Sequence, residues 1–199
     1  MGLTLNTSSL TVASSGGGSG VSTSDVTTLI KNNTPWQFIA KLTASASTTI
    51  EYTSLTTDFQ TFRIMYEDLT FNQNSDIYLQ LYLDGTLYTS NEYKTAGYAS
   101  VNGSSQTHYA TQTSWRPIEG YESGDGSRHV MGFTDIGCNN TSSEKQMHSR
   151  VSSASTTSPT TYNFSGHVQY QSGKLITGFK LTAGSGNWTR GSIKIYGMN

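Results

Sequence analysis

The sequence predicts an all-β fold: an antiparallel β-sandwich or jelly-roll-like domain over residues 36–199, preceded by an extended N-terminal arm over residues 1–35. Short segments rich in β-branched and aromatic residues recur after residue 35, and Gly, Asn, Asp and Ser separate them. The clearest segment, residues 76–83, alternates apolar and polar positions with the two-residue period of a half-buried strand. No segment after residue 35 has the periodicity of a core helix, so both observations favour an all-β class.

The first 35 residues predict an arm, a tether and a short helix. Residues 14–20 have the Gly/Ser composition of a flexible linker, and residues 22–30 can form a short amphipathic turn. Such a turn is too short to be stable alone, so we expect it to dock on its own domain, a neighbouring copy or a larger assembly; a frayed terminus is the alternative. The predicted contact residues are Leu3, Leu5, Leu10, Val12, Val26, Leu29 and Ile30.

The strands of the second region follow from local patterns. In residues 76–83 the apolar side chains Ile77, Leu79 and Leu81 share one face, and Asp84-Gly85 then predicts a two-residue hairpin turn into 86–88. The earlier β-prone segments are 36–42, 48–52 and 61–67. The later ones are 106–112, 128–134, 144–152, 161–170, 174–182 and 191–196.

Composition excludes several classes of partner. A formal net charge of −1 gives no positive field for nucleic acid, and no apolar run approaches the length that spans a bilayer. Only 13% of residues are charged, whereas 29 Ser and 30 Thr supply uncharged polar surface. Cys138 is the single cysteine, and the first residues lack a signal-peptide pattern, so we expect synthesis in a reducing cytosol.

No motif predicts catalysis, a cofactor or a metal, and we expect a protein that is not an enzyme. Nucleophile-elbow and phosphate-loop patterns are absent from the sequence. Glu119, Glu122 and Asp125 could hydrolyse a sugar or hold Ca²⁺, although a solvated loop is the simpler interpretation. Four histidines fall in predicted strands and would bind a metal only if those strands converged: His108, His129, His148 and His167.

Aromatic residues crowd the region 93–121, which we interpret as loops around the predicted strand 106–112. Exposed aromatic side chains on loops form interface anchors, stack on sugar rings or cover the rim of a sandwich, and the sequence leaves these three roles open. The residues concerned are Tyr93, Tyr98, Tyr109, Trp115 and Tyr121.

Several stretches resemble a family of small tailed-bacteriophage virion proteins. The resemblance begins at residues 3–7, continues through the Gly-rich tether and 25–30 to 38–47, and includes 49–55, 59–64 and 79–85. The ending, residues 185–197, is similar to the close of those proteins. Residues 95–160 carry no such resemblance.

The resemblance implies a virion role without catalysis. The family includes head decoration (cement) proteins, head fibres and tail-associated modules, usually β-sandwiches assembled as homotrimers. We therefore expect a capsid decoration protein that binds the major capsid protein, or another virion protein, on the head exterior and stabilises the shell. The alternative is a tail or head-fibre module that binds a host receptor or glycan.

Overall fold

The structure is a computed structural model in which the chain divides into two units, 1–35 and 36–199. In the first unit, the strands β1 (Leu5–Asn6) and β2 (Ser9–Leu10) form a short antiparallel pair, with Leu5 opposite Leu10. The residues described are 5–6, 9–10, 35–73, 75–101, 104–118, 129–137, 139, 143–154, 160–171 and 173–199.

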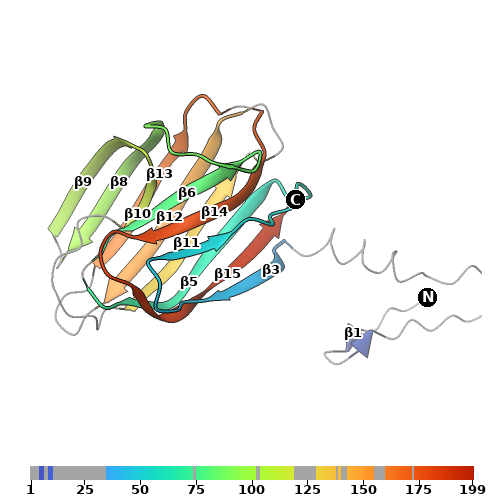
Figure 1. Cartoon of the computed structure of the whole chain (residues 1–199), viewed down its shortest axis with the longest axis horizontal. Helices are drawn as coiled ribbons and strands as arrows, with labels where there is room; N and C mark the ends of the chain where they lie inside the picture. Colours follow the sequence, from blue (N-terminus) through green and yellow to red (C-terminus); the bar gives the residue numbers. More distant parts are fainter. Residues whose placement is uncertain are drawn as a thin grey trace, which may run out of the picture. The chain divides into compact units, whose positions relative to one another are not determined.

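Two antiparallel sheets make up the second unit (Figure 1). The eight-stranded sheet has the order β3-β15-β5-β11-β12-β13-β8-β9. Its strands are β3 (Gln37–Thr43), β15 (Trp188–Met198), β5 (Thr61–Phe71), β11 (His129–Gly137), β12 (Lys145–Ala154), β13 (Thr160–Val168), β8 (Tyr93–Val101) and β9 (Ser104–Gln112).

The five-stranded sheet has the order β10-β6-β14-β4, and β7 also pairs with β6. Its strands are β10 (Trp115–Ile118), β6 (Ile77–Leu83), β14 (Ile176–Ala183), β4 (Thr49–Tyr52) and β7 (Thr86–Leu87).

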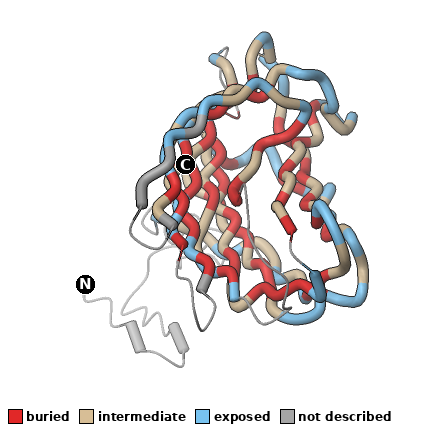
Figure 2. Tube along the Cα trace, turned by 90° about the vertical axis from the view of Figure 1, so that its left-hand side faces the viewer, coloured by how far each residue is buried: buried red, intermediate tan, exposed pale blue. Residues whose placement is uncertain are grey.

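One hydrophobic core joins the two sheets (Figure 2). In β6 every second residue is buried, so Leu79 and Leu81 point into the core while Gln80 points away from it. In β5 the buried positions Phe62 and Ile64 follow the same period. The expected all-β class with antiparallel sheets is confirmed, and the arrangement is sandwich-like.

A bulge in β5 changes which residues face the core. Tyr66 is buried and Glu67 and Asp68 are not, after which Leu69 is buried again. The pairing register of β5 shifts at this point against both β11 and β15. Gly191 of β15 has a φ of 102° here, and a side chain on it would meet the Asp68 carbonyl oxygen at 2.4 Å. The bulge therefore presents two neighbouring acidic residues on one side of the sheet.

A buried chain of hydrogen bonds crosses from one sheet to the other. The Tyr66 hydroxyl lies 2.7 Å from Thr134 Oγ1, which lies 2.8 Å from Ser149 Oγ. Ser149 Oγ in turn accepts a 2.7 Å hydrogen bond from the indole Nε1 of Trp115, which belongs to β10 of the other sheet. These four side chains are almost fully shielded from solvent, so each polar atom depends on its neighbour in the chain.

Every predicted strand is present, with small shifts at the ends, and the Asp84-Gly85 turn joins β6 to β7. The region 93–121 is not a run of loops, because its described part forms β8, β9 and β10. The predicted helical turn over residues 22–30 lies outside the described residues.

The backbones of β8 and β13 approach each other closely at Gly97. Gly97 lies opposite Phe164, and a Cβ on Gly97 would approach the Asn163 carbonyl oxygen to 2.2 Å. Replacing Gly97 by valine should therefore force the two strands apart and lower the free energy of unfolding by about 1–3 kcal/mol. Urea unfolding measures this. Ala96→Val, at an exposed neighbour, is the control and should change stability by less than about 0.5 kcal/mol; equal losses in both variants would contradict the explanation.

Candidate binding face on the eight-stranded sheet

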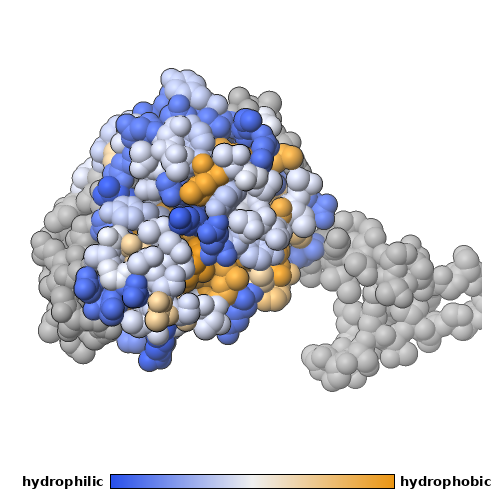
Figure 3. Space-filling view, in the orientation of Figure 1, coloured by the Kyte–Doolittle hydropathy of each residue, from blue (hydrophilic) through white to orange (hydrophobic). Residues whose placement is uncertain are grey.

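The side of the eight-stranded sheet that points away from the core, which we call the outer face, carries large side chains that remain exposed. In the described part of the chain, four of the five exposed large hydrophobic residues belong to this sheet; the fifth, Tyr170, follows β13. The four are Phe38, Tyr98, Tyr109 and Met131. An exposed apolar surface of this kind favours a contact role. Figure 3 shows the opposite side of the molecule, where the five-stranded sheet lies in front, and there hydrophilic residues surround a smaller hydrophobic area.

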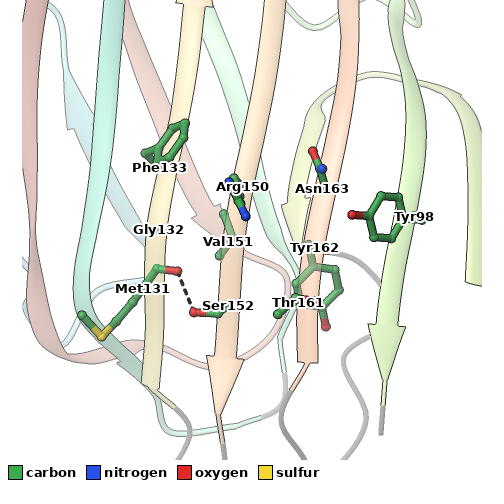
Figure 4. A pocket seen from close by; sticks show the side chains of 10 residues that line it. All are labelled: Tyr98, Met131, Gly132, Phe133, Arg150, Val151, Ser152, Thr161, Tyr162 and Asn163. Atoms are coloured by element: carbon green, nitrogen blue, oxygen red, sulfur yellow. Dashed lines mark hydrogen bonds between the residues drawn. The ribbon is translucent and has the colours of Figure 1, made fainter. Parts of the chain in front are cut away.

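Strand register sets four outer-face side chains in a row across four strands. Tyr98 of β8 lies opposite Asn163 of β13, which lies opposite Arg150 of β12. Arg150 lies opposite Phe133 of β11. Figure 4 shows the four side chains in this sequence across the sheet. Adjacent strands are about 4.8 Å apart, so the two aromatic residues at the ends of the row are separated by about 14 Å.

A pocket of about 530 Å³ opens along this row. The next row of outer-face residues, Met131, Ser152 and Thr161, borders it on one side, and Ser152 Oγ donates to the Met131 carbonyl oxygen over 3.4 Å. Short side chains between larger ones create the depression, which Figure 4 shows from close by. Its volume is in the range typical of sites for small ligands.

Arg150 is the cationic side chain that lines the pocket. It is exposed, and within the described part of the chain it has neither a hydrogen bond nor an ion pair. Arg63, by contrast, donates from Nε to Asp135 Oδ1 over 2.6 Å and from Nη2 to Asp135 Oδ2 over 2.7 Å. This bond raises the pKa of Arg63 and neutralises the carboxylate. A guanidinium with no such partner is available to an anion from solution.

Aromatic stacking fixes one wall of the pocket. The Arg63 guanidinium lies 4.4 Å from the centre of the Trp36 ring and 4.2 Å from the centre of the Phe133 ring. Phe133 also contacts the His148 ring. Phe133 is therefore held by neighbours on the same face, whereas the Tyr98 side chain at the opposite end of the row remains half exposed.

The Asn163 amide is oriented by a neighbour. His148 Nε2 lies 3.1 Å from Asn163 Oδ1, and because a carbonyl oxygen only accepts, the ring nitrogen is the donor. The amide oxygen is thus engaged, and the Nδ2 amino group is the part of Asn163 that can donate to a ligand.

The acidic residues of the bulge are paired on the same face. The Lys194 Nζ group donates to Glu67 over 2.6 Å and lowers the pKa of that carboxyl. The hydrogen bond with His129 and the positive charge of Arg190 lower the pKa of Asp68. The negative charges of both carboxylates are therefore compensated by these neighbours and do not compensate the positive charge of Arg150.

The four histidines occupy strands as predicted, but the described ones have separate partners. His129 contacts Asp68, His148 contacts Asn163, and His167 Nε2 lies 3.3 Å from Glu144. Among the residues that the structure describes, no three potential metal-ligating side chains come together. The side chain of the fourth, His108, lies outside the description.

The predicted aromatic set is divided between core and surface. Tyr93 and Trp115 are fully buried in β8 and β10, so of the three roles left open only packing fits them. Tyr93 donates to the Tyr88 carbonyl and accepts from the Leu81 N–H, which satisfies its hydroxyl inside the core. Tyr98 and Tyr109 are exposed, and Tyr121 lies outside the described residues. Of the five, Tyr98 alone lines the pocket.

The remaining predicted residues lie outside what the structure describes. This applies to the acidic cluster at 119–125 and, apart from the backbone of Leu5 and Leu10, to the apolar residues of the arm, which are Leu3, Val12, Val26, Leu29 and Ile30. Within the described chain, no helix has the length and apolar character to cross a membrane.

Comparison with known proteins gives no relative. No protein-family model, no curated protein and no solved structure matches the chain.

Proposed function

We propose that this chain is a non-enzymatic structural protein of a bacteriophage virion, a capsid decoration protein that binds the head exterior as a homotrimer and stabilises the shell. The observation that carries the proposal is the edge strand β9, which among the described strands pairs with β8 alone. The sequence resemblance to tailed-phage virion proteins supports it, and so does the arm that we expect before the sandwich-like unit.

Strand β9 has the features of an edge that can pair with another chain. It has nine residues and pairs with β8 from end to end without a register shift. It contains no Lys, Arg, Asp, Glu or Pro, and Tyr109 at its outer face is 88% exposed. Proteins ordinarily interrupt or charge such edges, because unpaired backbone groups recruit other strands.

The other described edges of the two sheets carry those protections. β3 contains Lys41 and an irregular register against β15. β4 is four residues long and contains Glu51, and β10 combines Arg116 with Pro117. β7 has two residues. The contrast supports the proposal that a neighbouring subunit adds a strand at β9.

A homotrimer follows if β9 of each copy meets a different surface of the next copy. Such a contact is heterologous, and three repeats of it close a ring. The arm, with its apolar residues at 3–12, then supplies a second point of attachment to the shell and raises the effective concentration of each subunit there.

Adding a charge to β9 should break the assembly. Tyr109→Lys places a cation on the edge at a position that makes little contact with the fold, so the domain should keep its stability while self-association weakens at least about tenfold. Sedimentation velocity measures the association. Tyr170→Lys, at a 71% exposed tyrosine away from the edge, is the matched control and should associate like the original chain.

Two results would overturn this proposal. One is a chain that is monomeric at high concentration, and the other is a Tyr109→Lys variant that associates unchanged. A label on Asn199, imaged in intact virions, tests the location: label over the head surface supports a decoration protein, and label on the tail favours the second function.

The second candidate function is a tail or head-fibre module that binds a host receptor or glycan. The specific observation in its favour is the outer-face pocket beside Tyr98 and Arg150.

A further inference from the structure

We infer that the outer-face pocket binds a sugar that carries a carboxylate, of the uronic acid class. This deepens the second candidate function and does not depend on capsid attachment or on the trimer. The row from Tyr98 through Asn163 and Arg150 to Phe133 supplies the contacts.

The charge of the site selects an anion. Arg150 lines the pocket without a partner among the described residues, whereas Asp135, Glu67 and Asp68 on the same face of the sheet are each paired with a cation or with His129. A guanidinium forms two parallel hydrogen bonds with a carboxylate, a geometry that lysine cannot reproduce. A single free arginine suits one carboxylate better than the repeated charges of a nucleic acid.

The polar groups beside Arg150 suit hydroxyls. Ser152 and Thr161 offer hydroxyl groups that donate and accept, and Asn163 offers the Nδ2 amino group. A sugar ring presents hydroxyls at its edge and an apolar face of C–H groups. The exposed ring of Tyr98 can cover that face, while Arg150 holds the carboxylate.

An acidic peptide fits this surface less well. Peptides that bind sheets commonly use an unpaired strand edge, but the pocket lies over β11, β12, β13 and β8, each of which is paired on both sides. The backbone groups under the pocket are therefore already engaged, and side chains alone make the contact.

The test compares an oligosaccharide that contains glucuronic acid with its carboxyl-reduced form, using the full chain and calorimetry. The acidic form should bind at least about tenfold more tightly, because a hydrogen-bonded charge pair is lost on reduction. Arg150→Gln should abolish this preference, whereas Tyr98→Ala should weaken both forms alike. Arg190→Gln, at an exposed arginine outside the pocket, should bind like the original chain.

The inference is wrong if none of a panel of uronic acid oligosaccharides binds, or if Arg150→Gln leaves the preference for the acid unchanged. Binding of an acidic peptide in place of every sugar would also overturn it. Thermal unfolding of each variant checks that the fold is unchanged, as we expect because all three substituted side chains are exposed. A monomeric Tyr109→Lys chain should still bind the sugar. A negative result for sugar binding therefore leaves the proposed assembly untouched, and a negative result for assembly leaves the proposed sugar site untouched.

Discussion

Replacing Thr134 by valine should lower the free energy of unfolding by about 3 kcal/mol, because it breaks the buried chain of hydrogen bonds at its centre. Thr134 Oγ1 contacts both the Tyr66 hydroxyl and Ser149 Oγ, and all three side chains are buried. Valine fills nearly the same space, so the loss comes from two polar atoms left without this partner. Burial raises the pKa of Tyr66, so its phenol stays protonated. In the variant its buried hydroxyl therefore lacks the hydrogen bond to Thr134.

Urea unfolding followed by tryptophan fluorescence measures the effect, since Trp115 lies at the other end of the chain of hydrogen bonds. Thr161→Val, at an exposed position of the same sheet, is the control and should cost less than about 0.5 kcal/mol. The double variant Thr134→Val/Ser149→Ala should lose less than the sum of the two single losses, because the two hydroxyls share one hydrogen bond. Full additivity, or a loss in Thr134→Val no greater than in the control, would show that the chain does not stabilise the fold.

The buried chain also shows what the sequence leaves out. The strands that contain Tyr66, Thr134 and Ser149 were predictable from short β-prone segments between turn residues, but the partners of a buried hydroxyl depend on pairing between distant strands. Nothing in the sequence near Trp115 indicates that its indole reaches Ser149. The local pattern therefore predicts the elements, and the cross-sheet contacts arise from tertiary packing.

Two strands were missed for physical reasons. In β8 the positions facing the core include Thr95, Gly97 and Ala99, which are too small to produce an apolar alternation. At Gly97 only a small residue fits, because β13 approaches closely there. β10 is only four residues long and contains Pro117, a residue that ordinarily argues against a strand but is tolerated at a sheet edge.

Of the four residues in the row, the sequence pointed to only one. Tyr98 was singled out as an aromatic contact, but Asn163, Arg150 and Phe133 join it through the order of four strands that are far apart in sequence. Aromatic residues alone cannot separate core from surface, as the buried Trp115 shows. A periodicity argument applied to 93–101 would have placed Tyr98 outward, had the strand been recognised.

Removing residues 1–30 should abolish attachment to the phage head without unfolding the second unit. Among the residues that the structure describes, every member of the hydrophobic core lies between Ala44 and Ile195. The truncated chain should therefore keep its packing, and its free energy of unfolding should change by less than about 0.5 kcal/mol. Attachment through two linked contacts exceeds that through one by a factor of about 100 or more, and the deletion should remove this gain. Co-sedimentation with heads that lack the protein measures the occupancy.

A variant of the full chain separates the apolar contacts of the arm from its length. Changing Leu3, Leu5, Leu10 and Val12 together to serine keeps the tether and should reproduce the loss of attachment, because burial of these side chains supplies the contact energy in this mechanism. Truncated or serine-substituted chains that occupy heads fully would exclude the arm as an anchor. Attachment would then have to come from the sheet surfaces, and Tyr109→Lys, which alters the β9 edge, would become the variant that decides between edge pairing and a contact through the outer face.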